Sequence, residues 1–107
     1  MKFLTLLKLR PGGAPPDPQM AVMLNEATKA WIEGELAAGR LDVAYNVLPN
    51  QSGYYGMGIG NAPSLEAMFQ QLTTYPAYLM NDFEVYPLSD VQQAINEVSA
   101  AFKKMMG

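Results

Sequence analysis

Hydrophobic and polar positions along the first forty residues predict a strand followed by a long helix. Residues 2–9 are dense in Leu and Phe and end at a Pro-Gly-Gly turn, which indicates a buried strand. Asp17 is a good N-cap, and Pro18 stands at the first helical position, where its missing N–H costs nothing. Apolar residues then recur at helical spacing until Gly39, which is placed to end the helix. The predicted apolar stripe is Met20, Met23, Leu24, Ala27, Trp31, Gly34 and Ala38.

The middle of the chain reads as a hairpin. Residues 40–48 alternate between apolar and polar, residues 49–53 have the composition of a turn, and residues 54–61 form a second strand. The alternation predicts that four apolar positions of the first strand share one face of the sheet: Leu41, Val43, Tyr45 and Val47.

The last third of the chain predicts two further helices and a strand. A helix begins at the cap Ser64 and ends by Pro76, a strand covers about 82–87, and Ser89 caps a tail helix over 89–105. The buried side of the first helix is predicted as Leu65, Met68, Phe69 and Leu72, and the tail carries Val91, Ile95, Val98, Phe102 and Met105 on one stripe.

The element order β-α-β-β-α-β plus a tail helix is the split-βαβ pattern of a ferredoxin-like α+β fold. We therefore predict one domain over 1–107, with 89–105 as a C-terminal helical extension. Its four-stranded antiparallel sheet should have the order 4-1-3-2, with both long helices on one face. The first strand is apolar on both faces, so the other sheet face should pair with a second copy, giving at least a homodimer. The tail helix should pack on a neighbouring subunit or across the end of the barrel.

Composition narrows the possible chemistry. A net charge of −3 with only seven basic residues argues against a nucleic-acid partner. Histidine and cysteine are both absent, which removes imidazole and thiolate chemistry and the usual zinc and haem ligands. We expect no metal and no cofactor, with any acid–base chemistry carried by Asp, Glu, Lys, Tyr or the termini. The apolar run at the start is too short for a signal peptide or a membrane span, so the expected location is cytoplasmic, with no membrane partner.

Several segments resemble one known family. They are Trp31 to Gly39 (WIEGELAAG), Pro63-Ser64-Leu65-Glu66-Ala67, and Tyr75-Pro76 followed by Phe83-Glu84-Val85 and Pro87-Leu88. In this order they are similar to segments of the muconolactone isomerase-like family of the dimeric αβ-barrel superfamily. The resemblance implies sheets paired face to face and a small-molecule pocket between sheet and helices. Several relatives use histidines in that pocket, and one branch also uses a cysteine; this chain has neither.

The remaining candidate site residues are aromatic or polar. We predict Tyr45 and Glu26 as catalytic residues, and Trp31, Tyr55, Asn25 and Arg40 as substrate-binding residues, with Arg40 positioned to clamp a carboxylate. Three glycines alternate within one strand, Gly56, Gly58 and Gly60; they allow either tight packing against a helix or the floor of a pocket.

Three functions stay open. The first is a muconolactone isomerase-like enzyme that acts by proton transfer on a lactone or similar carboxylated ring, so that the ligand would be a small aromatic or lactone-like acid. The second is a non-catalytic oligomeric module for ligand binding or assembly. The third is a cofactor-free monooxygenase, for which Trp31, Asn46 and Tyr55 supply the residue types.

Overall fold

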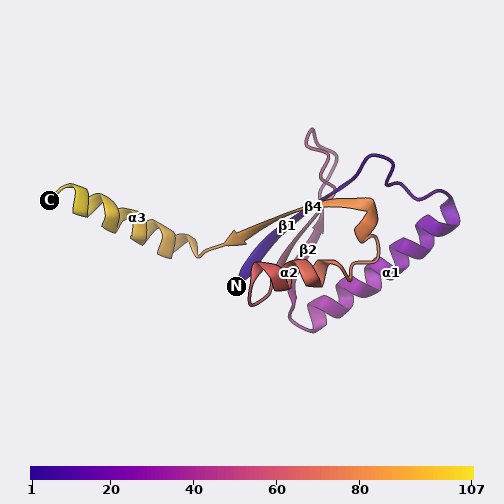
Figure 1. The fold of residues 1–107 in the computed structure, drawn as a ribbon, viewed down its shortest axis with the longest axis horizontal. Helices are drawn as coiled ribbons and strands as arrows, with labels where there is room; N and C mark the ends of the chain where they lie inside the picture. Colours follow the sequence, from indigo (N-terminus) through magenta and orange to yellow (C-terminus); the bar gives the residue numbers. More distant parts are fainter.

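The structure, a computed structural model, describes all 107 residues and has a ferredoxin-like α+β architecture (Figure 1). Two helices cover one face of a four-stranded sheet, and a third helix extends away from the sheet. The elements in chain order are β1 (Lys2–Leu9), α1 (Pro18–Ala37), β2 (Leu41–Asn46), β3 (Gly56–Asn61), α2 (Leu65–Leu72), the short 3-10 helix η1 (Tyr78–Met80), β4 (Asn81–Leu88) and α3 (Val91–Met105).

The sheet has the strand order β2-β3-β1-β4, and every neighbouring pair is antiparallel. This confirms the order predicted from the sequence. The connection between β2 and β3 is too short for a crossover, so these strands form a hairpin. β1 is central because its side chains are apolar on both faces, whereas the shorter β2 lies at an edge.

The helix ends follow the local sequence, with one correction. The Asp17 side chain accepts a hydrogen bond from the amide of Met20 (2.8 Å), and Gly39 ends the turn after α1 with a φ of 75°. The tail helix is capped by Asp90, not by Ser89 as predicted. The Asp90 carboxylate accepts from the amide of Gln93 (2.9 Å), so α3 begins one residue later than Ser89 would allow.

The core lies between the helices and one face of the sheet, which we call the helix face. Phe3 of β1 is fully buried there, beside Met68 and Leu72 of α2. Leu65 and Phe69, which were predicted to share this buried side, are each 44% exposed. An eight-residue helix over a twisted sheet can bury only its central stripe, so its flanking apolar side chains stay half exposed.

The buried stripe of α1 also differs from the predicted one. Leu24, Thr28, Trp31 and Glu35 turn toward the sheet, whereas Met20, Met23, Ala27, Gly34 and Ala38 are exposed. Two of the inward residues are polar, and Glu35 is buried because it has charged and amide partners there. A buried polar group with partners costs little, so an apolar stripe alone does not locate the inner side of this helix.

A bulge in β2 changes which residues share a face. Leu41 and Val43 pair with adjacent residues of β3, which leaves Asp42 as the extra residue. Leu41 therefore points to the helix face and Val43 to the opposite face. The prediction that Leu41, Val43 and Tyr45 lie on one face is wrong for this reason: Tyr45 follows Val43 to the side away from the helices.

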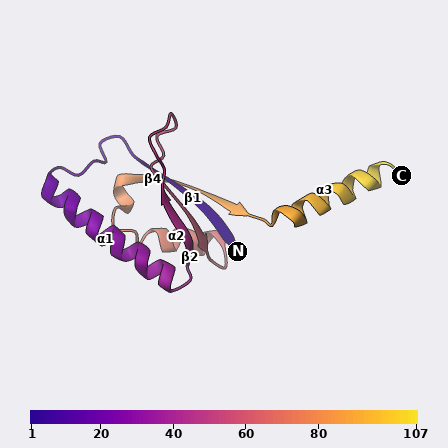
Figure 2. The ribbon, with the colours of Figure 1, turned by 180° about the vertical axis from the view of Figure 1, so that it is seen from behind.

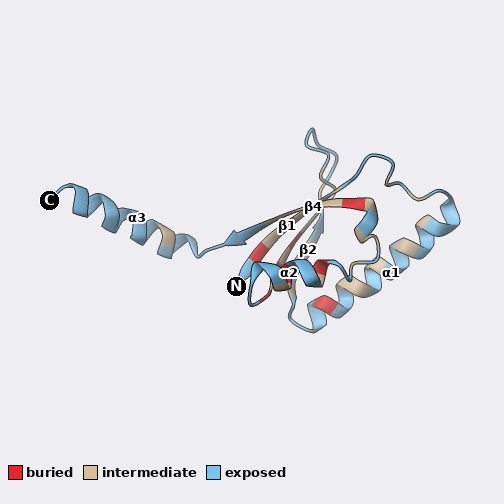
Figure 3. Ribbon diagram, viewed as in Figure 1, coloured by how far each residue is buried: buried red, intermediate tan, exposed pale blue.

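The third helix has no support from its own domain. Both ribbon views show α3 extending from the end of β4, apart from the sheet (Figures 1 and 2), and its surface is almost wholly exposed (Figure 3). The Cα radius of gyration is 17.5 Å, against about 13 Å for a compact chain of this length. Its predicted apolar stripe faces solvent, with Val91 68% and Phe102 60% exposed. No helix in the chain combines the length and the apolar character that a membrane crossing requires.

Candidate functional site

A cavity of about 290 Å³ lies between α1, α2 and the helix face of the sheet. Trp31 comes from α1, Gln71 and Leu72 from α2, and Thr5 from the central strand β1. The cavity exists because two helices and a twisted sheet diverge on one side of the core. Its size matches a single-ring compound at the lower end of the range for small-molecule pockets.

Glycines make the floor of this cavity. Gly56 and Gly58 line it, and no side chain rises from either. Gly60 has a different role, because a Cβ there would meet the Met68 side chain at 3.0 Å and the Arg40 carbonyl oxygen at 3.2 Å. Both interpretations of the alternating glycines therefore apply within one strand: tight packing at Gly60 and open floor at Gly56.

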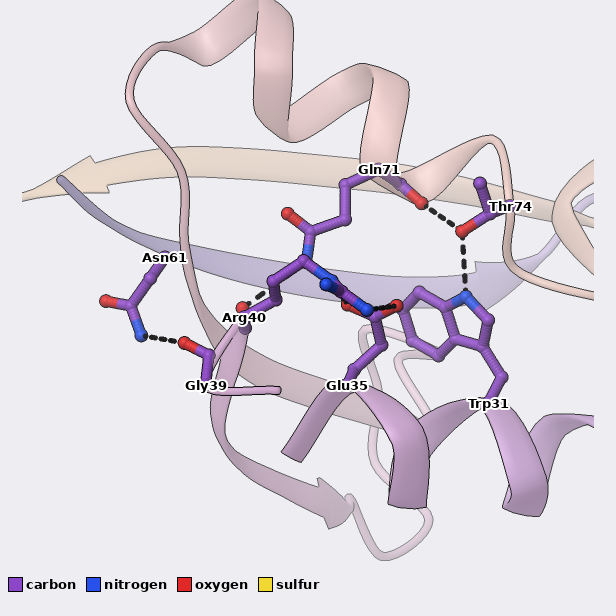
Figure 4. Close-up of polar contacts among 7 residues, drawn as sticks. All are labelled: Trp31, Glu35, Gly39, Arg40, Asn61, Gln71 and Thr74. Atoms are coloured by element: carbon purple, nitrogen blue, oxygen red, sulfur yellow. Dashed lines mark hydrogen bonds and ion pairs between the residues drawn. The ribbon is translucent and has the colours of Figure 1, made fainter. Parts of the chain in front are cut away.

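An aromatic wall closes one side. The Tyr75 ring meets Trp31 and Phe83 edge to face, at centroid separations of 5.3 and 5.8 Å. Tyr78 stacks on Phe83 behind them, at 5.5 Å. Trp31 is further held by its indole N–H, which donates to the Thr74 hydroxyl (2.8 Å; Figure 4). Such packing holds the rings in one geometry, so the wall is a preformed surface for a planar ligand.

The polar end of the cavity is Tyr55, which a buried asparagine outside the cavity lining holds in place. The Tyr55 hydroxyl donates to Oδ1 of Asn81, which is only 2% exposed, and Asn81 Nδ2 donates to the Ala77 carbonyl oxygen (2.9 Å). Burial raises the pKa of Tyr55 to about 12, and the neighbouring Tyr75 hydroxyl contributes to this rise. Tyr55 is therefore a neutral phenol throughout the physiological pH range.

The cavity lining holds no charged group. None of the 18 lining residues is Asp, Glu, Lys or Arg. Its polar members are Thr5, Thr28, Asn46 and Gln71, together with the tyrosines. Nowhere in the chain do three or more carboxylate side chains gather in a way that would hold a metal ion. The arrangement suits binding of a neutral or weakly polar ring more than ionic capture of a ligand.

The structure brings together only part of the predicted site. Trp31 and Tyr55 line the cavity. Asn25 and Glu26 are exposed on α1 and are absent from the lining. Tyr45 borders the cavity, but it pairs with Met57, a residue of the opposite face, and is 65% exposed. Paired residues share a face, so the Tyr45 side chain leaves the sheet on the side away from the helices.

Arg40 does clamp a carboxylate, but the carboxylate belongs to the same chain. Its guanidinium donates to both oxygens of Glu35, at 2.6 and 3.2 Å (Figure 4). Gln71 Nε2 donates to the same carboxylate (2.8 Å), which ties α1 to α2. The hydrogen bond from Arg40 is the main reason why the pKa of Glu35 lies below its ordinary value. This ion pair holds the C-terminal end of α1 next to the cavity. Because the Arg40 guanidinium is bonded to Glu35, it is not free to bind the carboxylate of a ligand.

Replacing Glu35 by Gln is expected to lower the melting temperature at neutral pH by a few degrees. The lowered pKa means that the carboxylate stabilises the fold at and above pH 4.5 and that this contribution is lost as the pH falls further. The difference between the variant and the native protein should therefore shrink below pH 4.5. Melting curves from pH 3 to pH 8 measure the difference in melting temperature between the variant and the native protein. Glu33→Gln, on the exposed side of α1, is the control. Equal effects of the two substitutions would contradict a stabilising role for the pair.

Sequence reasoning missed several residues of the site. Tyr75 and Gln71, which line the cavity, and Asn81, which bonds Tyr55, were assigned no role, because each lies in a segment interpreted only as helix end, turn or strand start. One signal was present for Asn81: a polar residue directly before an apolar strand has to find partners if it is buried. Nothing in the local pattern indicated that the partner would be Tyr55, which is 26 residues away.

Comparisons with known proteins place the fold. No protein-family model matches the chain, and no curated protein matches it in sequence. Among solved structures it is similar to muconolactone isomerase, with a TM-score of 0.70 and 22% identity over 84% of this chain and 90% of that one. It is also similar to 5-chloro-2-hydroxyhydroquinone dehydrochlorinase (TftG) from Burkholderia phenoliruptrix in complex with 2,5-dihydroxybenzoquinone. That match has a TM-score of 0.64 and 20% identity over 87% of this chain and 98% of that one. The resemblance to muconolactone isomerase is thus confirmed in the fold: this chain has the ferredoxin-like architecture of that enzyme over 84% of its own length.

Proposed function

We propose that this chain is a small-molecule enzyme that binds a single planar ring in the cavity and rearranges it by proton transfer, as an isomerase of the muconolactone isomerase type would. The observation that carries the proposal is the preformed cavity itself, with glycines beneath, an aromatic wall beside and one polar end. The two solved relatives act on or bind compounds with one small ring, and a lactone or a hydroxylated ring would fit the same dimensions.

The uncharged lining limits how such a reaction could work. Moving a proton from carbon to carbon next to a carbonyl needs a base, and Tyr55, with a pKa near 12, is protonated at neutral pH. The lining of one subunit offers no carboxylate in its place. In our proposal the base therefore comes from beyond these residues.

We further propose that the chain assembles as a homodimer or larger homo-oligomer. The sheet face away from the helices, which we call the outer face, carries the half-buried side chains of Leu4, Leu6, Met57 and Ile59. Lys8 and Asp82 stand opposite each other at one end of this face. Glu84 lies beside Leu6 on the same face. A largely apolar patch that carries charges of both signs can pair with a two-fold copy of itself. The exposed stripe of α3 offers a second surface for the same partner.

Cofactor-free oxygenation is the second candidate, and one observation favours it. Trp31, Asn46 and Tyr55, the three residue types expected for such an enzyme, line the same cavity although they come from α1, β2 and the loop before β3. This reaction would also tolerate a lining without carboxylates. Oxygen uptake in the presence of a ring substrate separates it from proton transfer, which consumes no oxygen.

Filling the cavity tests the site. A Cβ at Gly56 would have only ordinary contacts, with Leu7 atoms at 3.7 and 3.8 Å, so Gly56→Val should fold and place its methyl groups in the cavity. We expect its affinity for a neutral butenolide or a phenol to fall about tenfold or more, since overpacking costs about 1–3 kcal/mol. Trp31, the single tryptophan, lies in the cavity wall, so its fluorescence reports binding. Gly34→Val, at an open position of α1, is the matched control.

Turnover distinguishes the three functions. Deuterium entering a ring carbon from heavy water, without oxygen uptake, supports the isomerase-type proposal. Oxygen uptake supports cofactor-free oxygenation, and binding without either change supports a non-catalytic binding module. If neither a butenolide nor a phenol alters Trp31 fluorescence or the melting temperature, the cavity is not a ligand site and the proposal fails.

A further inference from the structure

Asn81 orients the only hydroxyl hydrogen of Tyr55. The asparagine is 2% exposed, so its amide group has to satisfy its hydrogen bonds within the protein. Its Nδ2 atom donates to the Ala77 carbonyl oxygen, which can only accept, and this settles which end of the amide is nitrogen. The Oδ1 atom is then left as the acceptor for the Tyr55 hydroxyl.

This arrangement decides what Tyr55 offers to the cavity. A phenol has one hydrogen to donate and lone pairs with which to accept. With its hydrogen committed to Asn81, the oxygen of Tyr55, a lining residue of the cavity, keeps lone pairs that can accept a further hydrogen bond. Burial keeps this phenol protonated by raising its pKa to about 12, so the hydrogen stays available to Asn81 at neutral pH.

Tyr75 is a neighbour of this hydroxyl. Its own hydroxyl interacts with that of Tyr55 and helps to raise the pKa of Tyr55, and its ring packs edge to face against Trp31 and Phe83. A phenolic oxygen can accept more than one hydrogen bond, so a donor from a ligand is compatible with Tyr75 in place.

We propose that Tyr55 determines ligand specificity by accepting a hydrogen bond from a hydroxyl group on the ring of the ligand, with Asn81 as the residue that positions it. The cavity would thus select hydroxylated rings over the same rings capped as methyl ethers. This inference rests on the proposed use of the cavity as a ligand site, and it adds the chemical group that the site recognises.

The test compares phenol with anisole, its methyl ether, by titration of Trp31 fluorescence. In the native protein phenol should bind about three- to tenfold more tightly, which corresponds to one hydrogen bond worth about 0.5–1.5 kcal/mol. Tyr55→Phe should reduce this ratio to one or below. Tyr54→Phe is the matched control, because the Tyr54 hydroxyl bonds Glu84 on the outer face, and the ratio should stay unchanged there. Tyr75→Phe should leave the preference for phenol in place.

The outcomes separate this inference from the proposed function. Equal binding of the two probes by the native protein would overturn the inference and leave the cavity as a ligand site, and this measurement does not depend on any variant folding. A ratio that persists in a folded Tyr55→Phe protein would also overturn it. If neither probe binds, both the proposed function and the inference fail.

Discussion

A chain truncated after Ser89 is expected to form smaller assemblies than the full protein and to lose solubility or melting temperature. The α3 stripe leaves five large apolar side chains in water, and each contributes about 1.5–3 kcal/mol when fully buried. A 15-residue helix is marginally stable alone, so α3 needs a partner surface, and its own domain does not supply one. Light scattering of full-length and truncated protein at micromolar concentration measures the effect.

The apolar stripe can be tested without removing the helix. The double variant Ile95→Ser and Phe102→Ser should behave like the truncated chain. The control Asn96→Ser and Ala100→Ser alters the other side of the same helix and should leave the mass unchanged. Unchanged assembly and melting temperature in the truncated chain would refute a role for α3 in association.

Leu6→Asp should convert the protein to a monomer. Leu6 lies in the middle of the outer face, where it pairs with Met57 of β3 on one side and Glu84 of β4 on the other. An added carboxylate there would lie beside that of Glu84 and would be desolvated in the interface, a cost on the order of several kcal/mol in each subunit of a two-fold pair. Sedimentation or light scattering reports the mass, and Leu79→Asp, at a position 76% exposed and off the sheet, is the control.

The two surfaces make separable predictions. If the outer face forms the dimer and α3 joins dimers into a larger assembly, the chain truncated after Ser89 should have the smaller mass of a dimer, whereas the Leu6→Asp variant should not form that dimer. A native protein that is monomeric at micromolar concentration would reject both the outer face and α3 as association surfaces. In either case the melting transition of the variant shows whether the domain itself has stayed folded.

The sequence was most informative where the physical cause is local. The Asp17 and Ser64 caps act over three residues, and a short polar turn can join only antiparallel strands, so the helix starts and the hairpin were predictable. The sequence was least informative about which side chains share a face of the sheet. The Asp42 bulge depends on partners from other elements, since its carboxylate accepts hydrogen bonds from Lys2 and Asn61. A single extra residue there moved Tyr45 to the other side of the sheet.

By itself, then, the sequence determined the order of the elements, the antiparallel sheet and the exclusion of histidine and cysteine chemistry, because periodicity, caps and composition need no distant partner. Only the tertiary structure decided which side chains meet. Arg40 turned from a candidate substrate clamp into the partner of Glu35, and Tyr55 acquired its orientation from Asn81. These contacts depend on strand register and on how the helices lie over the sheet, which bring together residues that no local pattern connects.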